Sequence, residues 1–404
     1  MVQLLAGIRV LEVAVWTYVP AAGAVLAEWG ADVIKVEHPE TGDPQRGLVS
    51  SGLLGKSGVD FSVEVANRGK RSIGLDMSTD EGHEVLLELA KTSDVFLTSF
   101  LPRSRRRLRI DVDDIRAVNP NIVYVRGSAL GQRGPEAEKG GYDFSTYWGR
   151  GGSSDTATPA NAEYPVGQPG GAYGDVLGGL TIAGGITAAL LHRERTGEAL
   201  VVDSSLLAMG AWATGFSIAA ANLFGLERMG GGTRYDSPNP LVGTYRTKDN
   251  RFISIVLLQS DRFWPDFVRR LDSPALATDE RFQTSAGRAE HKRECMELID
   301  EAFAARTLAE WKEVLDDFEG VWAPVQTVSE VARDPQVVAN GYIRDIQAED
   351  GTTFKLVASP LQFNETPPEL TRAPKHGEHT DEILESLGYD MDRILDLKVK
   401  GAVL

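Results

Sequence analysis

The chain has 404 residues, of which 42% are apolar and 25% are charged, a composition that excludes general disorder, collagen-like repeats and a disulfide scaffold. Because one domain usually takes ~100–200 residues, this length favours two domains over one. Acidic residues outnumber basic ones 58 to 42, and the net charge of −16 argues against nucleic acid as a partner, although a local basic patch can still bind a small phosphorylated ligand.

The cysteine content and the uncharged segments indicate the protein's surroundings. The one cysteine, Cys295, cannot form an intrachain disulfide and is interpreted as a structural thiol. The N-terminal residues lack the basic region and cleavage site of a secretory signal. The uncharged runs 176–191 and 204–226 are interpreted as buried helices, because the second contains serine, asparagine and glycine residues that suit a membrane span poorly. We therefore expect a reduced, cytoplasmic protein with no membrane segment.

The first third of the chain alternates strand-like and helix-like segments. Buried strands are predicted at 8–14, 31–37, 71–76, 94–98 and 121–126. Helices are predicted at 20–29, 79–90 and 111–118. Strands separated by helices predict a parallel sheet with both faces covered, over residues 1 to about 130.

The remainder of the chain predicts a long loop and a smaller domain. Residues 149–174 are rich in glycine, serine, proline, alanine and threonine, which indicates a loop of the length that is usually functional or mobile. A β-hairpin is predicted at 241–257, and amphipathic helices at about 260–271, 288–305 and 307–318 complete a small α+β domain. A last helix is predicted near 379–388.

Several common catalytic and nucleotide-binding motifs are missing from the sequence. The first strand–turn–helix carries Trp16 and Tyr18 in the turn AVWTYVPAAG, where a dinucleotide fingerprint needs GxGxxG, so a pyrophosphate cannot approach the backbone. The sequence also contains no Walker A motif, no GxSxG elbow and no HExxH pair. These absences argue against a dehydrogenase, a P-loop NTPase, a standard α/β-hydrolase and a zinc protease.

Two clusters allow both a functional and a structural interpretation. Five arginines fall within 103–109, and this run is either a solvated helix face or, with Lys70 and Arg71, a phosphate-binding site. His376 and His379 have the spacing of a metal pair, but no further ligands of fitting spacing are visible, and capping of the following helix explains the segment more simply. We therefore predict no metal site.

The strongest single feature is Asp175, which follows Gly174 at the start of the first uncharged run. An acid at a helix N-terminus is commonly a cap that the helix macrodipole stabilises. Because this helix is apolar all round, its carboxylate is also expected to be partly desolvated and yet reachable past its glycine neighbours, which suits a nucleophile. The residues alone leave both roles open.

Motifs in a fixed order over nearly the whole chain resemble one enzyme family. They are LAGIRVLEV, LAEWGADVIKVEHPETGDPQR, NRGKRSIGLDM, NPNIVYVRGSALGQRGP, GGYDFSTYWGRGG, GDVLGG, LLHRERTGE, APVQTVSEVARDPQV and APKHGEHTDEILESLGY. The chain is thereby similar to the family III CoA-transferases, which include formyl-CoA transferase, carnitine CoA-transferases and α-methylacyl-CoA racemase. The resemblance implies an enzyme that moves CoA from an acyl-CoA donor to a carboxylic acid acceptor, with no cofactor beyond coenzyme A itself.

The resemblance also implies roles for individual residues. The acid of GDVLGG matches the family's catalytic aspartate, so Asp175 is implied to be the nucleophile that carries a covalent aspartyl-CoA intermediate. Tyr142 and Asp143 match a tyrosine–acid pair near the transferred acyl group. The residues implied to bind CoA and its phosphates are Trp16, Thr17, Tyr18, His38, Lys70, Arg71, Leu75, Phe100 and Arg107.

Departures from the family pattern bear on the reaction. Racemase members carry histidine at the position of Tyr142, and a tyrosine with a pKa of ~10 is a poor base at neutral pH. This departure favours a transferase, and a racemase is kept as the alternative, together with a non-catalytic CoA-binding homologue. The formyl-CoA type carries glutamine at the position of Thr17 and a four-glycine lid, which here is shorter or shifted (GGGTRYDSPNP), so formate and oxalate are not the expected substrates.

The implied fold is α/β, with a Rossmann-like large domain and a smaller α+β domain. We expect the large CoA-binding domain to begin with 1–226, the small domain to occupy 227–330, and 331–404 to return to the large domain. The resemblance further implies an interlocked homodimer. The expected partners are thus acyl-CoA, a carboxylic acid and a second copy of the chain.

Overall fold

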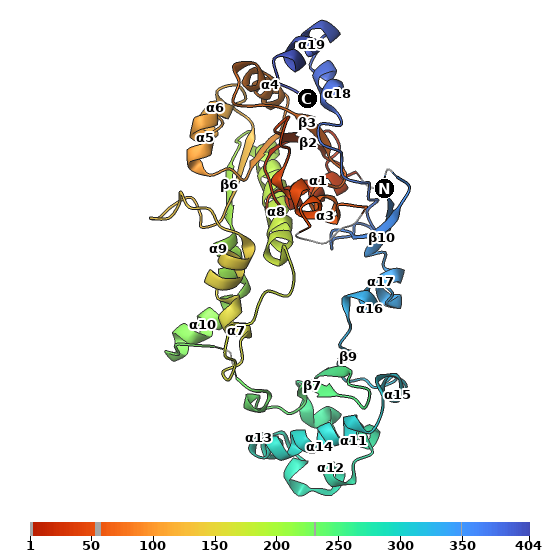
Figure 1. Cartoon of the computed structure of the whole chain (residues 1–404). Helices are drawn as coiled ribbons and strands as arrows, with labels where there is room; N and C mark the ends of the chain where they lie inside the picture. The colour runs from red at the N-terminus through yellow and green to blue at the C-terminus, as the bar shows by residue number, and fades with distance from the viewer. Residues whose placement is uncertain (1–2, 53–57, 230–231, 349) are drawn as a thin grey trace. The chain divides into compact units, whose positions relative to one another are not determined.

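The computed structural model describes residues 3–52, 58–229, 232–348 and 350–404 (Figure 1). The chain forms two compact units. The first contains Met1–Thr156, Pro165–Met229 and Pro335–Leu404, and the second contains Ala157–Tyr164 and Gly230–Asp334. In the glycine cluster at the start of GGGTRYDSPNP, residues 230 and 231 lie outside the described residues.

A six-stranded parallel sheet is the centre of the first unit (Figure 1). Its strands are β1 (Arg9–Val13), β2 (Asp32–Glu37), β3 (Arg71–Gly74), β4 (Val95–Thr98), β5 (Val123–Ser128) and β6 (Val201–Ser205). Their order is β3-β2-β1-β4-β5-β6, and each neighbouring pair runs parallel. Because the order changes direction between β1 and β4, the carboxyl ends of these strands flank the crevice in which open α/β sheets bind ligands.

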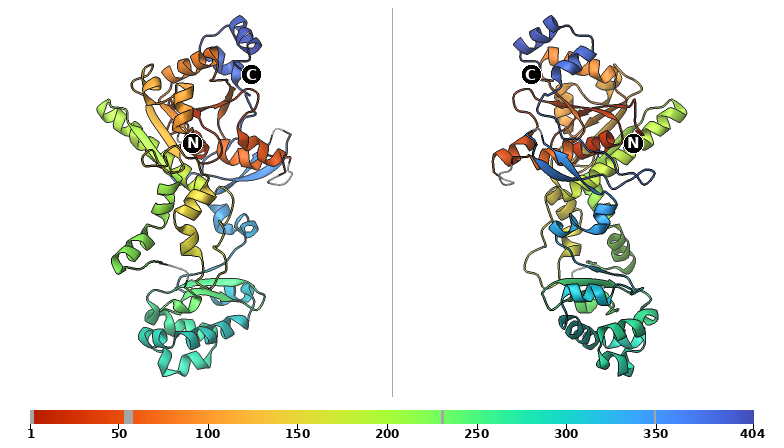
Figure 2. Two further views of the ribbon diagram at one scale, coloured as in Figure 1. Left: turned by 60° about the vertical axis from the view of Figure 1, so that its left-hand side comes forward. Right: turned by 90° about the vertical axis from the view of Figure 1, so that its right-hand side faces the viewer.

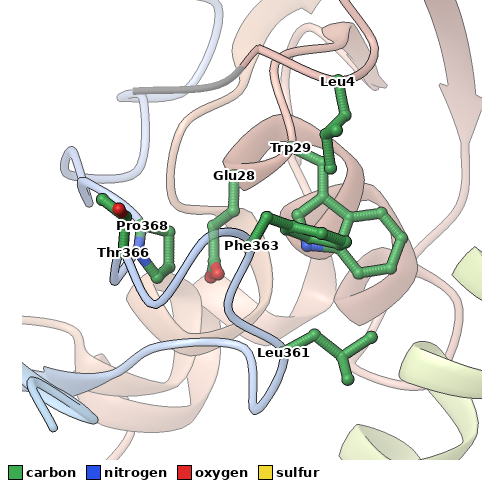
Figure 3. Close-up of a pocket in the computed structure, with 7 residues that line it drawn as sticks. All are labelled: Leu4, Glu28, Trp29, Leu361, Phe363, Thr366 and Pro368. Atoms are coloured by element: carbon green, nitrogen blue, oxygen red, sulfur yellow. The ribbon is translucent and has the colours of Figure 1, made fainter.

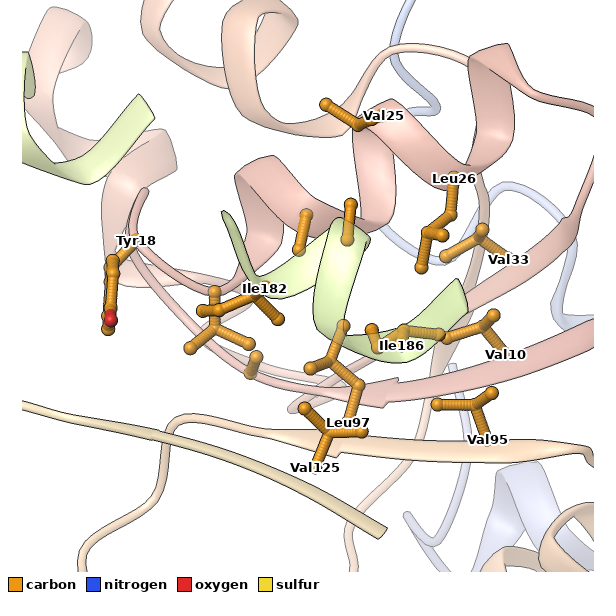
Figure 4. Packing of buried hydrophobic residues seen from close by; sticks show 14 of the residues in the cluster. Val10, Tyr18, Val25, Leu26, Val33, Val95, Leu97, Val125, Ile182 and Ile186 are labelled. Atoms are coloured by element: carbon orange, nitrogen blue, oxygen red, sulfur yellow. The ribbon is translucent and has the colours of Figure 1, made fainter. Parts of the chain in front are cut away.

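One face of this sheet is covered by two helices that pack against each other, α1 (Pro20–Glu28) and α8 (Tyr173–Thr196). They share a buried apolar cluster with β1, β2, β4 and β5. Figure 4 shows Ile182 and Ile186 of α8 within this cluster, close to Leu97 of β4. Helix α8 has the length and hydropathy of a membrane span, but 44% of its apolar window is buried, and its partners are α1, β5 and β6.

The opposite face is covered by helices from both ends of the chain. Helices α4 (Asp80–Lys91), α18 (Thr380–Ser386) and α19 (Met391–Val399) form a second apolar cluster with side chains of the same strands. The strands are therefore buried on both faces, as a parallel sheet requires. The C-terminus also pairs with the sheet edge, where Val403 forms a β-bridge with Leu75 after β3.

The other elements of the first unit are short. They include α2 (Gly47–Ser50), α3 (Phe61–Asn67), α5 (Pro102–Leu108), α6 (Val112–Arg116), α17 (Pro335–Ala339), β10 (Ile343–Gln347) and β11 (Thr353–Val357). After β11 the chain passes the end of α1, where Phe363 packs edge-on against Trp29 with ring centroids 5.9 Å apart (Figure 3). A cavity of about 20 Å³ lies between these segments.

The second unit has its own sheet and core. Its strands β7 (Val242–Arg246), β8 (Phe252–Val256) and β9 (Trp322–Pro324) form an antiparallel sheet. Its helices are α11 (Ser260–Leu271), α12 (Pro274–Thr278), α13 (Ser285–Glu290), α14 (Lys292–Ala304), α15 (Leu308–Val314) and α16 (Val328–Val331). Figure 2 shows helices along one face of this sheet, and the apolar cluster between them includes Tyr245, Trp311 and the buried Cys295.

The prediction of one buried helix at 204–226 is wrong. Strand β6 extends through Ser205, and two helices follow, α9 (Leu206–Ala213) and α10 (Gly215–Phe224), bent by 63°. The break falls at Thr214, whose Oγ1 donates a hydrogen bond to the Gly210 carbonyl at 2.9 Å. Large apolar side chains of these helices are exposed, namely Trp212, Phe216, Leu223 and Phe224.

The predicted loop at 149–174 is shorter than expected. A π-helical segment (Phe144–Arg150) and α7 (Ser153–Ala157) occupy its first part, and α8 begins at Tyr173. Polar side chains stabilise these turns locally: the Oγ1 of Thr156 donates to the Gly152 carbonyl at 3.1 Å. Composition alone cannot distinguish such bonded turns from an open loop.

Two glycines of α8 test the packing of its N-terminal half. A Cβ at Gly178 would lie 2.2 Å from the Tyr18 ring, whereas one at Gly184 would meet no atom within 4 Å. We expect Gly178→Ala to destabilise the protein by about 1–3 kcal/mol, because the ring or the helix must shift. The control Gly184→Ala should stabilise it by about 0.5–1 kcal/mol, because alanine is the better helix former. Urea unfolding measures both, and equal effects would contradict this packing.

Candidate active site

A pocket of about 540 Å³ opens at the carboxyl ends of β1, β4 and β5. This is the crevice that the strand order predicts. Six residues singled out in the sequence line it: Trp16, Tyr18, Phe100, Arg107, Tyr142 and Asp175. Residues more than 150 positions apart in the chain therefore meet at one site.

The carboxylate in this pocket belongs to Asp175, in the first turn of α8. The residue before the helix is Ala172, which has a φ of 58° and makes no side-chain cap, and Asp175 is the acidic residue of the first turn. Among the described residues, none donates a hydrogen bond to its carboxylate. Burial, with a smaller contribution from the nearby Asp143 charge, raises the pKa of Asp175 to about 7.

Glycines let two tyrosine rings pack directly against the start of α8, the turn that carries Asp175. A Cβ at Gly174 would lie 2.4 Å from the ring of Tyr147, just as one at Gly178 would strike Tyr18. The hydroxyl of Tyr18 lies 2.8 Å from the Oγ of Ser204 in β6. Burial raises the pKa of Tyr18, and so does the Asp175 charge, although the Ser204 hydrogen bond acts in the opposite direction. The phenol is therefore neutral beside the carboxylate.

Tyr142 and Asp143 enter the site from the segment before the π-helical turn. Tyr142 is exposed, lines the pocket and meets Trp16 edge-on, with ring centroids 5.7 Å apart. Asp143 is buried, and its two oxygens accept hydrogen bonds from the Phe144 N–H at 2.7 Å and from Nε2 of Gln168 at 2.8 Å. Nothing in the sequence marked Gln168, because this contact joins residues 25 positions apart.

The first turn shapes another wall of the pocket. Trp16 has a φ of 66°, in the left-handed region that a residue with a Cβ rarely adopts. Thr17 is buried and donates its hydroxyl to Oε1 of Gln45 at 3.0 Å, so its side chain is directed into the fold. Of the three turn residues expected to contact CoA, Trp16 and Tyr18 line the pocket.

The arginine run forms α5 and the residues flanking it, and its members have different partners. Arg107 lines the pocket beside Phe100. Arg105 is buried and donates to the Phe100 carbonyl at 2.8 Å, while Arg106 pairs with Glu138 at 2.7 Å. Arg109 pairs with Asp80 at 3.1 Å. The run is thus mainly structural, with Arg107 directed to the pocket.

Four further residues expected to bind CoA do not line this pocket. Lys70 is buried, and its Nζ donates to both oxygens of Glu12, to the Pro20 carbonyl and to Oδ1 of Asn67. Its pKa falls to about 7, because burial outweighs the Glu12 charge. These contacts leave no N–H of Lys70 for a phosphate.

The other three lie along β2 and β3. Arg71 pairs with Asp32 at 2.7 Å and with Glu382 at 3.1 Å. Leu75 is fully buried in the second apolar cluster. His38 is half-exposed, with its Nε2 4.0 Å from Asp76.

No metal cluster is found in the described ranges, which contain no group of three or more histidine, cysteine, aspartate or glutamate side chains that could hold an ion. Both histidines of the HGEH segment contact backbone groups through a ring nitrogen. Nδ1 of His379 accepts the Ser72 N–H at 3.3 Å, and Nε2 of His376 lies 2.9 Å from the His38 carbonyl.

Comparison with known proteins gives one consistent family. Residues 5–380 match the CoA-transferase family III. The chain is 30% identical over 404 residues to the (R)-2-hydroxy-4-methylpentanoate CoA-transferase of Clostridioides difficile, with 98% of each chain covered. It is 32% identical over 390 residues to the succinate–glutarate CoA-transferase of Agrobacterium fabrum, with 95% of each covered. A CAIB/BAIF family protein from Brucella suis has a similar crystal structure, with a TM-score of 0.81 at 28% identity, covering 95% of this chain and 99% of that one.

The chain therefore belongs to the family III CoA-transferases. It is a CoA-transferase, an enzyme that acts on an acyl-CoA and a carboxylic acid, as its motifs predict. The α/β fold class is confirmed as well, since a parallel six-stranded sheet is combined with a smaller antiparallel one.

The raised pKa of Asp175 predicts how stability depends on pH. Between the ordinary value of 3.8 and the folded value of about 7, the folded protein keeps a proton that the unfolded chain releases, so stability falls as pH rises through this window. Asp175→Asn removes the ionisation, and the variant should be more stable than the wild type above about pH 7, by up to a few kcal/mol. Urea unfolding at pH 4 and pH 8 should show this advantage at pH 8 alone. An equal difference at both pH values would contradict the burial of the charge.

Proposed function

We propose that the carboxylate of Asp175 is the nucleophile of the transfer. One of its oxygens attacks the carbonyl carbon of the donor thioester, the C–S bond breaks, and a mixed anhydride and the CoA thiolate form. The thiolate then attacks the Asp175 carbonyl of the anhydride, which releases the donor carboxylate and leaves an aspartyl-CoA thioester. The acceptor carboxylate attacks this thioester, which frees the CoA thiolate and forms a second mixed anhydride between Asp175 and the acceptor. The thiolate then attacks the acceptor's carbonyl in that anhydride, which forms the new acyl-CoA and restores the Asp175 carboxylate.

The observation that carries this proposal is a reachable carboxylate with no donor of its own. Asp175 lines the pocket, its pKa is about 7, and no hydrogen bond from the described residues holds it. A substantial fraction is ionised at neutral pH, and that fraction has lost part of its hydration, which favours attack on a carbonyl. The first turn of α8 places it at the positive end of the helix, where negative charge is stabilised.

The pocket also supports a role in CoA binding for the residues that line it. Arg107 supplies a forked guanidinium for a phosphate, and Trp16 and Phe100 supply aromatic walls. Thr17, His38, Lys70, Arg71 and Leu75 are left out of this proposal, because their side chains do not line the pocket.

We further propose that the first unit is a Rossmann-like CoA-binding domain that the C-terminal segment completes. The strand order and the position of Pro335–Leu404 in this unit support the assignment. A homodimer would cover the exposed apolar side chains of α9 and α10, such as Trp212 and Phe216. The single free thiol, Cys295, supports a cytoplasmic location.

Replacement of Asp175 by asparagine tests the nucleophile directly. Turnover should fall by roughly three or more orders of magnitude, because an amide of nearly the same shape is a very poor nucleophile. CoA affinity measured by calorimetry should change by less than about 3-fold, since the phosphate contacts remain. The control Asp94→Asn, at the opposite end of the sheet and paired with Arg193, should keep turnover. An Asp175→Asn enzyme that retains most of its turnover would exclude the covalent mechanism.

A matched pair of arginines tests the phosphate site. Arg107→Ala should weaken CoA binding by roughly 10- to 100-fold, because a charge-assisted hydrogen bond contributes about 1.5–3 kcal/mol. Its neighbour Arg106, which pairs with Glu138 and does not line the pocket, provides the control. Arg106→Ala should leave the affinity within about 2-fold. Equal losses in the two variants would show general charge attraction in place of a specific contact.

A further inference from the structure

A group of charged side chains is buried beneath the first turn, and the mechanism above uses none of them. They are Glu12, Lys35, Glu37, Asp43, Arg46 and Lys70. They form three pairs: Lys70 lies 2.7 Å from Glu12, Lys35 lies 2.8 Å from Asp43, and Arg46 lies 2.7 Å from Glu37. Acids and bases are equal in number in this group, so each acid has a basic partner.

This buried group is bonded to the turn at several points. Nζ of Lys35 donates to the Ala14 carbonyl at 2.9 Å, and Oδ1 of Asp43 accepts the Trp16 N–H at 3.1 Å. Nζ of Lys70 donates to the Pro20 carbonyl at 2.8 Å. The turn between β1 and α1 is therefore held by charged side chains where no strand partner is present.

Asp43 has a special place in this arrangement, because it connects the charges to Trp16. Its Oδ1 accepts the N–H groups of Trp16 and Gln45, at 3.1 and 3.0 Å, while its Oδ2 faces the ammonium of Lys35 at 2.8 Å. The left-handed conformation of Trp16 is unfavourable for a residue with a Cβ and persists only where its surroundings hold it. The Asp43 carboxylate is the acceptor of this residue's N–H, and Ser99 Oγ contacts the preceding Val15 carbonyl at 3.5 Å.

We infer that Asp43, held by Lys35, is a positioning residue for the transfer reaction. It keeps Trp16 in the left-handed conformation, so that the indole stands edge-on to Tyr142 and forms the wall that aligns the acyl group with Asp175. This inference rests on the proposed assignment of the pocket to acyl-CoA. The buried Lys35–Asp43 pair then has a role in the reaction. Buried ion pairs often add no stability, so stability alone does not explain the pair.

Asp43→Asn is the variant that breaks this bridge with the least change in shape. An amide has a single oxygen, which cannot face Lys35 and accept the Trp16 N–H at the same time, so one of the two loses its acceptor. We expect kcat to fall by roughly 10- to 100-fold, because a misplacement of about 1 Å at a reacting centre has an effect of this size. CoA affinity should change by less than about 3-fold, since Arg107 is untouched.

A double-mutant cycle with Trp16→Ala distinguishes positioning from a general structural effect. If Asp43 acts through the indole, removing the indole leaves nothing for Asp43 to position. The kcat/KM of the double variant should then be within about 3-fold of that of the less active single variant. If Asp43→Asn does not fold, the charge-balanced pair Lys35→Met with Asp43→Leu, which also leaves the Trp16 N–H without its acceptor, takes its place in the same cycle.

The control is Glu28→Gln, which alters a buried acid with matching contacts. Glu28 pairs with Arg68 and accepts the Ser359 N–H at 2.8 Å, and it lies beside Trp29 at the far end of α1 (Figure 3). This variant should lose stability and keep kcat/KM within about 3-fold. Losses that multiply in the cycle would overturn the inference. An unchanged kcat/KM in Trp16→Ala alone would overturn it too, whereas the pocket assignment fails only if Asp175→Asn keeps its turnover or Arg107→Ala keeps its CoA affinity.

Discussion

The carboxylate of Asp175 is kept partly out of water by packing, with no hydrogen bond from the described residues to offset the loss of hydration. The rings of Tyr18 and Tyr147 pack against the first turns of α8 because the helix presents glycine where they touch it. The contact between α1 and α8 continues at Gly179, where a Cβ would lie 2.5 Å from that of Ala21. Close packing on the glycines of α8 thus shapes the surroundings of Asp175, and the apolar cluster shared by α1 and α8 supports it.

The distribution of charge follows from the same requirement. Two basic residues close to the first turn, Lys35 and Lys70, bind buried acids and backbone carbonyls. They therefore hold the backbone and do not line the pocket. The charged side chains that do line the pocket are Arg107 and Asp175. Burial of an ion costs less free energy when an oppositely charged partner is buried with it. Asp175, the proposed nucleophile, is buried without such a partner among the described residues.

Hydrophobic periodicity predicted much of the fold. Strand β2 was expected at 31–37 and occupies Asp32–Glu37, and α11 in the second unit has the bounds expected, Ser260–Leu271. Composition did not predict the bend after α9, which coincides with hydrogen bonds from the Thr214 hydroxyl to backbone carbonyls.

The site was only partly readable from the sequence, for a physical reason. Asp175 and Arg107 stood out by charge and context, but so did Lys70, and the acid that neutralises it, Glu12, is 58 residues away. Asp43 lies in a quoted motif but was not singled out, and Gln168 carried no signal, because the contact of each to the site joins distant segments. The type of a side chain indicates what it can bind, but the fold determines which groups lie next to it.

The central claim is that CoA is carried covalently on Asp175, and trapping of the acylated enzyme tests it most directly. Wild-type enzyme is incubated with a donor acyl-CoA in the absence of acceptor, quenched with hydroxylamine and digested with trypsin for mass spectrometry. The account predicts a hydroxamate on Asp175 that forms only when donor is present. A hydroxamate on another carboxylate, or none from an enzyme that turns over the same donor, would contradict it.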